Sequence, residues 1–368
     1  MKEPRIPGVF SFLRSLQSMV RKRPIVTLVD MSIADLLARK VWLAPMAGGV
    51  TTVDLAVAVG DAGAMPVLAA GYLSADAVTA ELASYRQRST APVGVNVFTP
   101  QPPTVSSEQL RRYSELLAPV AERLGSRLGE PVHDDDEYSG KIDALVEASP
   151  ELVTFTFGLP SEQDVARLHN VDVTVGITVT CVEEGRRALE VGADVLIAQA
   201  ASAGGHRSTH DPLRKPGRET VAELLYGLTP LDAPVVVAGG IVDAVGVEAA
   251  LRGGAAAVSC GTAFLLAEEA GTSGVHRQAL QDARFSSTVV TRAFTGRPAR
   301  ALSNAWTRLG VDAPAGYPDV HWLTRDLRRA AAHHCNPDWV HLWAGERWQD
   351  IRAAPAAAIA DHLLSGGR

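Results

Sequence analysis

The residues best suited to chemistry lie between positions 194 and 206. An apolar run there ends in Gln199, and small residues lead on to Gly204, Gly205 and His206. This pattern predicts a buried strand that ends in a flexible turn bearing one imidazole. Histidine titrates near neutral pH, so an imidazole at a strand's exit can take a proton from a substrate. We therefore expect His206 to act as a general base; the alternative is a loop histidine that only satisfies a backbone carbonyl.

The same turn is suited to binding a ligand but not a metal ion. Glycine has no Cβ, so Gly204 and Gly205 allow the backbone to lie close to a ligand. His206 and His210 have the spacing of helical zinc ligands, but no Glu follows the first of them and a helix is not expected after two glycines. We expect no metal site.

Four other predicted strand ends carry residues of a similar kind. The segment 45–49 either makes a tight turn or lets a flat ring lie against its small residues. Asn96 stands in an apolar strand, where its buried amide must find a partner in the protein or in a ligand. The other two ends are rich in glycine. The candidate ligand-binding residues at these four ends are Met46, Ala47, Asn96, Gly239, Gly240, Ser259, Cys260, Gly261 and Thr262.

The two glycine-rich ends form a pair with a recognised use in β/α barrels. A phosphate there often lies between the loops after strands seven and eight, held by backbone N–H groups and a helix N-terminus. Here the seventh run ends in Gly239-Gly240 and the eighth in Gly261-Thr262. The pair indicates a phosphorylated ligand, with ordinary glycine-rich turns as the alternative.

These candidate residues lie at the ends of predicted strands, and the sequence contains eight runs that could form such strands. Short runs rich in Val, Ile and Ala alternate with stretches of helical spacing, which is typical of parallel strands buried under helices. Eight such strands close a barrel, so we predict an α/β protein with a (β/α)8 TIM barrel. The alternative is a doubly wound open sheet, but its Gly-x-Gly-x-x-Gly signature is absent after the first run. The runs are 41–45, 66–70, 92–98, 152–157, 171–180, 195–200, 235–238 and 255–259, and the helical stretches are 53–63, 74–88, 161–168, 182–191 and 243–253.

Two segments interrupt the alternation. Residues 99–150 contain a helical stretch over 107–128 and an acidic turn at 133–137, which predict a helical insertion with the acidic turn as solvated surface. Residues 266–368 show no strand pattern and one helical stretch over 322–334, which predicts a C-terminal helical extension that caps the barrel. The expected organisation is an N-terminal extension over 1–32, a barrel over 33–265 and this cap, folded as a single unit.

The composition is that of a globular protein. The chain has 368 residues, of which 46% are hydrophobic and 21% charged, and its net charge of −6 argues against a nucleic-acid partner. Cys181, Cys260 and Cys335 lack metal-ligand spacing and indicate a reducing compartment. No apolar run is long enough to span a membrane, and Arg14 interrupts the apolar patch at 9–13. We expect a short amphipathic N-terminal helix, no signal peptide and a cytoplasmic protein.

Taken together, these segments resemble the nitronate monooxygenase family, formerly called 2-nitropropane dioxygenases. The resemblance runs from about Ile33 to Trp306, and Leu342-Trp343-Ala344-Gly345 is similar to the family's C-terminal motif. Five motifs in the same order carry it: Pro45-Met46-Ala47-Gly48-Gly49, Gly94-Val95-Asn96-Val97-Phe98, Gln199 with Gly204-Gly205-His206, Ala238-Gly239-Gly240-Ile241, and Gly261-Thr262-Ala263-Phe264.

The resemblance implies an FMN-dependent barrel that oxidises alkyl nitronates or nitroalkanes with O2 to a carbonyl compound and nitrite. It implies that His206 is the base and that Met46 and Ala47 lie against the flavin ring. The expected partners are a small-molecule substrate and O2, with no nucleic acid and no membrane, and homodimerisation is left open. The residues that match FMN contacts are Asn96, Gln199, Gly204, Gly240 and Ser259 to Thr262, and Gly205 and Gly239 adjoin them.

The chain departs from the family at Ala200 and Ser202, where members often carry Gly and Glu. Loss of that carboxylate would change what orients the loop or tunes the imidazole. Two rival functions remain: an FMN-dependent enoyl-thioester reductase that uses NAD(P)H and shares a Gly-Gly-His loop, and a non-catalytic flavin-binding barrel. A dehydrogenase of the inosine monophosphate type needs a cysteine after strand six, and residues 199–212 contain none.

Overall fold

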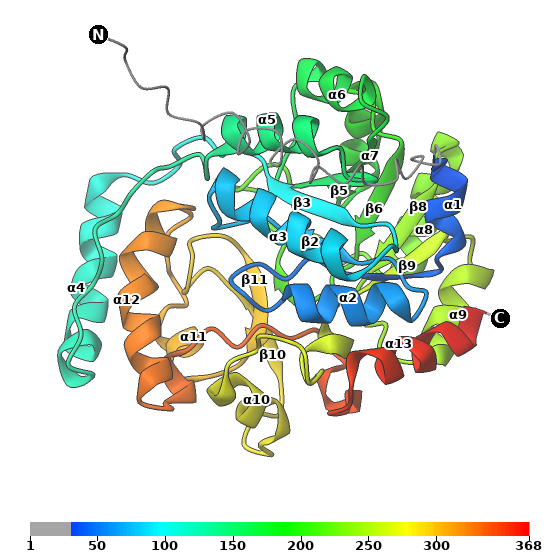
Figure 1. Cartoon of the computed structure of the whole chain (residues 1–368). Coiled ribbons are helices and arrows are strands. Elements are labelled where there is room, and N and C mark those ends of the chain that lie inside the picture. Colours follow the sequence, from blue (N-terminus) through cyan, green and yellow to red (C-terminus); the bar gives the residue numbers. More distant parts are fainter. Residues whose placement is uncertain (1–30, 368) are drawn as a thin grey trace, which may run out of the picture. The chain divides into compact units, whose positions relative to one another are not determined.

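The computed structural model describes residues 31–367, and eight parallel strands form its central sheet (Figure 1). Their order is β1-β9-β8-β6-β5-β4-β3-β2, so neighbours in space are mostly neighbours in the sequence. One strand lies in or at the edge of each predicted run. The strands are β1 (Val41–Leu43), β2 (Val67–Ala69), β3 (Gly94–Phe98), β4 (Leu152–Thr156), β5 (Thr174–Val179), β6 (Val195–Gln199), β8 (Val235–Ala238) and β9 (Ala257–Cys260).

The two ends of this sheet meet, so that it nearly closes on itself. Leu43 N donates to Met65 O and Met65 N donates to Val41 O, each at 2.8 Å, which joins β1 to the residues that precede β2. On its other side β1 pairs in parallel with β9, where Leu43 faces Cys260. A doubly wound sheet would leave two open edges. The (β/α)8 barrel predicted from the sequence is therefore confirmed.

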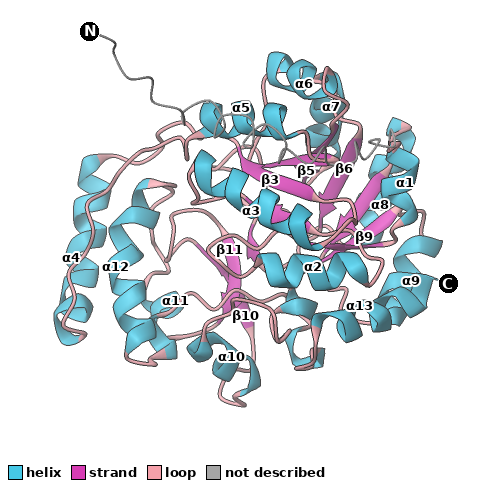
Figure 2. Ribbon diagram, in the orientation of Figure 1, coloured by secondary structure: helices cyan, strands magenta, loops and turns pink. Residues whose placement is uncertain are grey.

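Helices connect the strands and cover the outside of the barrel (Figure 2). Polar side chains at the N-caps Thr52, Ser74, Ser161 and Asp243 accept backbone N–H groups and begin four of the five predicted helices. The five are α2 (Val53–Asp61), α3 (Ala75–Arg88), α6 (Glu162–His169), α7 (Val182–Glu190) and α9 (Ala244–Arg252). The other α-helices are α1 (Ile33–Ala38), α4 (Ser107–Arg123), α5 (Tyr138–Ala148), α8 (Val221–Leu228), α10 (Gly274–Gln281), α11 (Ala305–Leu309), α12 (Asp319–His333) and α13 (Ala356–Leu364).

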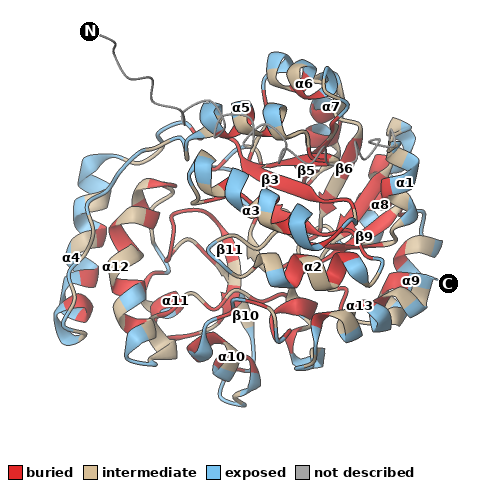
Figure 3. Cartoon of the chain, in the orientation of Figure 1, coloured by how far each residue is buried: buried red, intermediate tan, exposed pale blue. Residues whose placement is uncertain are grey.

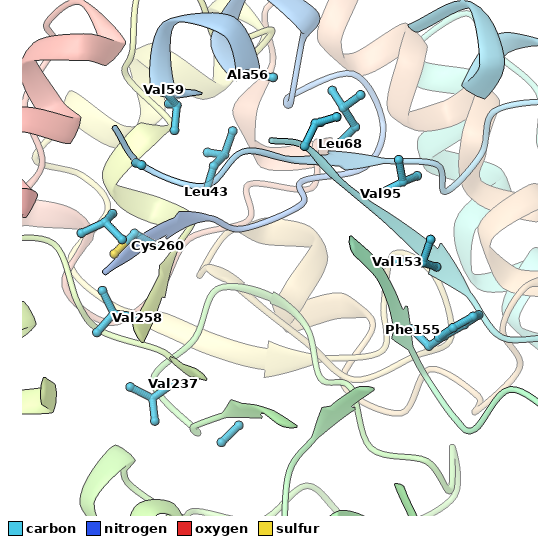
Figure 4. Packing of buried hydrophobic residues seen from close by; sticks show 14 of the residues in the cluster. Leu43, Ala56, Val59, Leu68, Val95, Val153, Phe155, Val237, Val258 and Cys260 are labelled. Atoms are coloured by element: carbon cyan, nitrogen blue, oxygen red, sulfur yellow. The ribbon is translucent and has the colours of Figure 1, made fainter. Parts of the chain in front are cut away.

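The main core lies between the strands and the surrounding helices. Val95, Val153, Phe155, Val237 and Val258 are fully buried, and their side chains pack with those of α2 and its neighbours (Figure 4). The strands are buried along most of their length, whereas the outer faces of the helices are exposed (Figure 3). Strands covered on both faces explain the unbroken apolar runs in the sequence.

The insertion over 99–150 contributes two helices with different packing. Helix α5 packs against α3 and takes the position of a barrel helix between β3 and β4. Helix α4 instead lies beside α12 of the C-terminal extension (Figure 1). There Tyr113 donates its hydroxyl hydrogen to Ala293 O at 2.5 Å and accepts from Trp306 Nε1 at 3.1 Å. The insertion and the extension thus share a second apolar core beside the barrel.

The C-terminal extension contains helices, including α12 within three residues of the predicted stretch, but it also contains strands that the sequence did not predict. β10 (Thr288–Thr291) and β11 (Ala299–Leu302) form an antiparallel sheet with β7 (Gly205–His206). Each strand has four residues or fewer, which is too short for a clear alternating pattern. The little sheet joins the extension to the loop that carries the predicted base.

Two expectations concern the N-terminal region. The expected extension over 1–32, with its short amphipathic helix, lies outside the described residues except for positions 31 and 32. Among the helices of residues 31–367, none is both long enough and apolar enough to cross a membrane.

Candidate active site

A cavity of about 330 Å³ opens where the strands end, and the predicted site residues gather around it. Every predicted ligand-binding residue lines the cavity except Cys260. Cys260 is buried in the main core, its carbonyl accepts from Ala44 N at 2.9 Å, and burial raises the pKa of its thiol to about 12. The Cys260 thiol therefore has no part in the cavity, and a ligand contact through the backbone of this residue stays a prediction. The residues that the structure brings together are Met46, Ala47, Asn96, Gln199, Gly204, Gly205, His206, Gly239, Gly240, Ser259, Gly261 and Thr262.

His206 is held between the barrel and the extension. It lies in β7, opposite Ala299 of β11, and its Nε2 atom is 2.9 Å from Thr295 Oγ1. Its Nδ1 atom has no hydrogen-bond partner among the described residues, and the ring lines the cavity. Burial, together with the positive charges of Arg297 and Arg328, lowers the pKa of His206 to about 3. The imidazole is neutral at pH 7 and has one nitrogen free.

Gln199 orients the loop that carries this imidazole. Its Nε2 atom donates to the carbonyl of His206 at 2.9 Å, and its Oε1 atom accepts from Ser208 N at 2.9 Å. Both ends of the amide are therefore used within the protein. Gln199 lines the cavity as predicted, but its polar atoms brace the loop rather than remaining free for a ligand.

Arg207 and Arg297 complete the scaffold behind the loop. Arg207 donates to the carbonyls of Ala200 and Gln199, and Arg297 donates to those of Arg207 and Thr209. Arg297 also lies over the ring of Phe157, 3.9 Å from its centroid. Arg297 also donates to Gln101 Oε1 at 2.7 Å, so the two guanidinium groups tie the loop to its neighbours and rigidify it.

The glycine pair after β8 adopts a conformation that few other residues tolerate. Gly239 and Gly240 have φ angles of +127° and +67°, and a Cβ at Gly240 would lie 3.0 Å from Ser202 Oγ. α9 begins a few residues later. Across the cavity, Thr262 Oγ1 accepts from Gly345 N at 2.9 Å, which leaves the hydroxyl hydrogen available. These backbone and hydroxyl donors surround a space suited to an anionic group.

Asn96 finds its nitrogen partners within the barrel. Its Nδ2 atom donates to Thr154 O at 3.2 Å and to the hydroxyls of Thr154 and Thr156, each at 2.9 Å. Its Oδ1 atom accepts no hydrogen bond from the described residues, and the side chain lines the cavity. The sequence left open whether the Asn96 amide pairs with the protein or with a ligand. The nitrogen pairs with the protein, and the oxygen remains available to a ligand.

Ser202, where the chain departs from the family, lies beside the glycine pair. A Cβ built on either Gly239 or Gly240 would come within 3.0 Å of its hydroxyl. The carbonyl of Ser202 accepts from Glu346 N at 3.1 Å. A change at this position therefore acts first on the glycine turn and the C-terminal segment.

The extension contributes several cavity residues that the sequence did not identify. His321 and Arg328 come from α12, His276 from α10, and Thr295 from the loop between β10 and β11. The sequence of α12 does contain a sign that these polar residues are buried. Positions 321, 324 and 328 fall on the same face of the helix as the buried Leu327 and Ala331. The sequence marks 342–345 as a motif without indicating its place in the fold. In the structure, Trp343 and Gly345 of this motif line the cavity.

The acidic turn at 133–137 is not simply solvated surface, contrary to the prediction. Asp136 Oδ1 accepts from Tyr72 N at 2.9 Å, and Asp136 forms an ion pair of 2.7 Å with the fully buried Lys141. Glu137 accepts from Ala75 N at 3.0 Å. The turn holds the loop after β2, and through it Tyr72, at the edge of the cavity.

Comparison with known proteins identifies the family. The model for nitronate monooxygenase matches residues 33–365. A probable nitronate monooxygenase of Bacillus subtilis (strain 168) is 34% identical over 341 residues, covering 89% of this chain and 95% of the relative. One of Staphylococcus saprophyticus is 32% identical over 330 residues, covering 87% and 92%.

Solved structures agree with this assignment. Nitroalkane oxidase from Streptomyces ansochromogenes has a TM-score of 0.86 and 40% identity, covering 90% of this chain and 96% of that one. FabK from Thermotoga maritima has a TM-score of 0.68 at 23% identity, covering 91% and 94%, which shows a shared fold alone.

The barrel, its cavity and these relatives define a flavin-dependent oxidoreductase. The chain belongs to the nitronate monooxygenase family.

Proposed function

We propose that this enzyme uses FMN and O2 to oxidise alkyl nitronates, or the parent nitroalkanes, to a carbonyl compound and nitrite, with His206 as the base. The observation that carries the proposal is one cavity lined both by the neutral imidazole of His206 and by the Gly239-Gly240 turn and Thr262. A flavin held in this cavity would supply the redox chemistry, as the carrier of electrons between the nitronate and dioxygen. The remaining chemistry falls to the side chains and backbone of the chain.

The residues present fit an FMN molecule. Gly239 and Gly240 line the cavity with positive φ angles, and their backbone N–H groups would hold the phosphate; a Cβ at either position would press on Ser202 and disturb this turn. The free Oδ1 of Asn96 suits an N–H donor of a flavin ring, and Met46 and Ala47 line the wall against which that ring would lie. Gly204, Gly205, Ser259, Gly261 and Thr262 complete the proposed set.

His206 would act through Nδ1, since Nε2 is engaged with Thr295. An imidazole whose pKa is lowered to about 3 is always unprotonated near neutrality, but it is also a weak base. Removing the α-proton of a neutral nitroalkane is therefore expected to be slow, whereas a preformed nitronate needs no proton transfer. The low basicity of His206 is the reason that we propose nitronates as the better substrates.

Aromatic side chains around the imidazole limit the access of water. The centroids of Phe157 and Trp343 lie 5.6 Å and 5.1 Å from that of His206, and Phe98 packs 4.5 Å from Phe157. Excluding water strengthens electrostatic interactions within the cavity. These rings also present apolar surface to the alkyl part of a nitronate.

Replacing His206 with Asn tests its assigned role. The variant should lose about 10²-fold or more of the rate with a neutral nitroalkane, because general base catalysis contributes on that scale. It should keep most of the rate with the matching preformed nitronate. Equal rates of the two enzymes with the neutral nitroalkane would show that His206 is not the base.

A further inference from the structure

Arg328 is a buried cation that lines the cavity without an acidic partner. The side chain is 6% exposed. Its Nε atom donates to Thr324 Oγ1 at 3.2 Å, and Nη2 donates to His321 O at 2.9 Å and to His321 Nδ1 at 3.2 Å. Its Nη1 atom makes no hydrogen bond to the described residues. Burial lowers the pKa of Arg328 to about 10, so the guanidinium stays charged at neutral pH.

The surroundings do not neutralise this charge. No Asp or Glu occurs among the described residues that line the cavity. The other cavity arginine, Arg347, is paired with Asp243 and Asp350, each at 2.7 Å. Asp326, the acid whose charge acts on Arg328, is itself paired with Arg325 at 3.2 Å. A buried charge left unpaired is costly unless a ligand compensates it.

His321, which lies beside Arg328, is held as a neutral donor. A guanidinium can only donate, so His321 Nδ1 must accept, and the ring proton of the neutral His321 lies on Nε2. The His321 ring stacks on Tyr72 at a centroid distance of 4.3 Å, which fixes its plane. Among the described residues, His276 Nε2 and His341 Nδ1 are buried without partners. Arg328 Nη1 and His321 Nε2 therefore remain as donors at the cavity, beside the unpartnered ring nitrogens of His276 and His341.

We propose that Arg328, assisted by the Nε2–H group of His321, binds the two oxygens of a planar oxyanion and so selects anionic substrates. The Nη1 group of Arg328 and the Nε2–H group of His321 are the donors left over, and between them they can reach two oxygens that share one negative charge. The nitronate group has such oxygens, and so does the nitrite released from it. This assignment of the substrate rests on the proposed function, but the anion site itself does not.

Two consequences follow for binding. A nitronate should bind more tightly than the neutral nitroalkane of the same carbon skeleton, because only the anion compensates the charge of Arg328. Nitrate, a planar oxyanion that the enzyme has no means to oxidise further, should occupy the same site and compete with the nitronate. Loss of charged hydrogen bonds of this kind weakens binding about 10- to 100-fold.

The test compares Arg328→Gln and Arg328→Lys with Arg329→Gln, an exposed neighbour on the same helix. Calorimetric titration of the FMN-loaded proteins with sodium nitrate measures binding without turnover. We expect Arg328→Gln to lose about 10-fold or more in nitrate affinity, Arg328→Lys to retain part of it because the charge remains, and Arg329→Gln to match the wild type. In kinetics, Arg328→Gln should raise the KM for a nitronate more than it lowers kcat.

The possible results distinguish the anion site at Arg328 from the proposed oxidation of nitronates. Nitrate affinity unchanged in Arg328→Gln, or equally reduced in Arg329→Gln, would overturn the anion site. Thermal unfolding of each variant reports any loss of folding, and Arg328→Lys keeps the test valid if the Gln variant is unstable. If the wild type binds nitrate through Arg328 but releases no nitrite from nitronates, the proposed function fails while the anion site stands.

Discussion

The Nε2 atom of His206 lies 2.9 Å from the hydroxyl of Thr295, which joins the imidazole of the barrel to the C-terminal extension. The backbone makes the same connection, because His206 pairs with Ala299 in the small antiparallel sheet. The extension is thus part of the active site and holds the imidazole from outside the barrel.

Replacing Thr295 with Val should slow proton removal. The substitution keeps the shape of the side chain but deletes the partner of Nε2, so the ring can turn and its tautomer is no longer favoured. We expect about a tenfold lower kcat with a neutral nitroalkane and a smaller effect with the preformed nitronate. Thr295→Ser, which keeps the hydroxyl, should restore the rate. Equal losses with both substrates would contradict a role in orienting the base.

Replacing Gly240 with Ala should weaken FMN binding. Its φ angle of +67° is unfavourable for Ala, and the new Cβ would meet Ser202 Oγ at 3.0 Å, beside the proposed phosphate cradle. We expect at least about tenfold weaker binding, measured by quenching of FMN fluorescence. Gly254→Ala is the control, since Gly254 has a φ of +100° but open space around it. It should lose stability without losing FMN affinity, and an unchanged affinity in Gly240→Ala would argue against the cradle.

Acidification should destabilise the protein through its buried histidines. Burial lowers the pKa of His276 to about 4, from 6.5 in an unfolded chain. Between pH 4 and pH 6.5 the unfolded state binds more protons than the folded state. The contribution of His276 to the free energy of unfolding is therefore complete above pH 6.5 and is lost as the pH falls toward 4. The loss is up to about 1.4 kcal/mol per pH unit.

Thermal or urea unfolding between pH 7 and pH 4.5 checks this prediction. His276→Gln should make the pH dependence shallower than in the wild type, whatever its effect on stability at pH 7. The exposed His334→Gln serves as the control and should leave the slope unchanged. Parallel curves for the wild type and His276→Gln would refute the assignment.

Removing the carboxylate of Asp136 should affect both stability and catalysis. Asp136→Ala leaves the fully buried Lys141 without its partner, and breaking such a pair costs about 3–5 kcal/mol. Adding Lys141→Met should recover most of that stability. It should not recover activity, because Tyr72 N still lacks the acceptor that holds its loop at the cavity. Full recovery of kcat/KM in the double variant would show that the turn has no role at the site.

Local patterns in the sequence predicted the barrel well. Buried parallel strands have an unbroken apolar composition, and the turns that need positive φ angles, such as Gly239-Gly240, require glycine. Both signals can be detected within a few residues. The same local evidence placed His206 after the end of β6, but the expected flexible turn was wrong at this residue, since His206 lies in β7 and pairs with Ala299 of β11.

The contributions of the extension could not be predicted in this way. Which segment lies across a barrel's mouth depends on packing between residues far apart in the chain, such as Tyr113 on α4 with Trp306. The short strands β10 and β11 gain their backbone hydrogen bonds from each other, from β7 and from the segment 342–344, all of which are distant in the sequence or too short to predict. Arg328 and His321 resemble ordinary polar residues until α12 is placed, although their spacing on its buried face was a usable sign.

The most direct test of the proposed function is a paired assay of the purified, FMN-loaded wild type. One arm supplies an alkyl nitronate in air and measures nitrite release together with O2 consumption. The other supplies NADPH without oxygen and follows the flavin absorbance. We predict nitrite and O2 consumption in the first arm and no bleaching in the second. Bleaching by NADPH with no nitrite from the nitronate would contradict nitronate oxidation and favour an enoyl-thioester reductase instead.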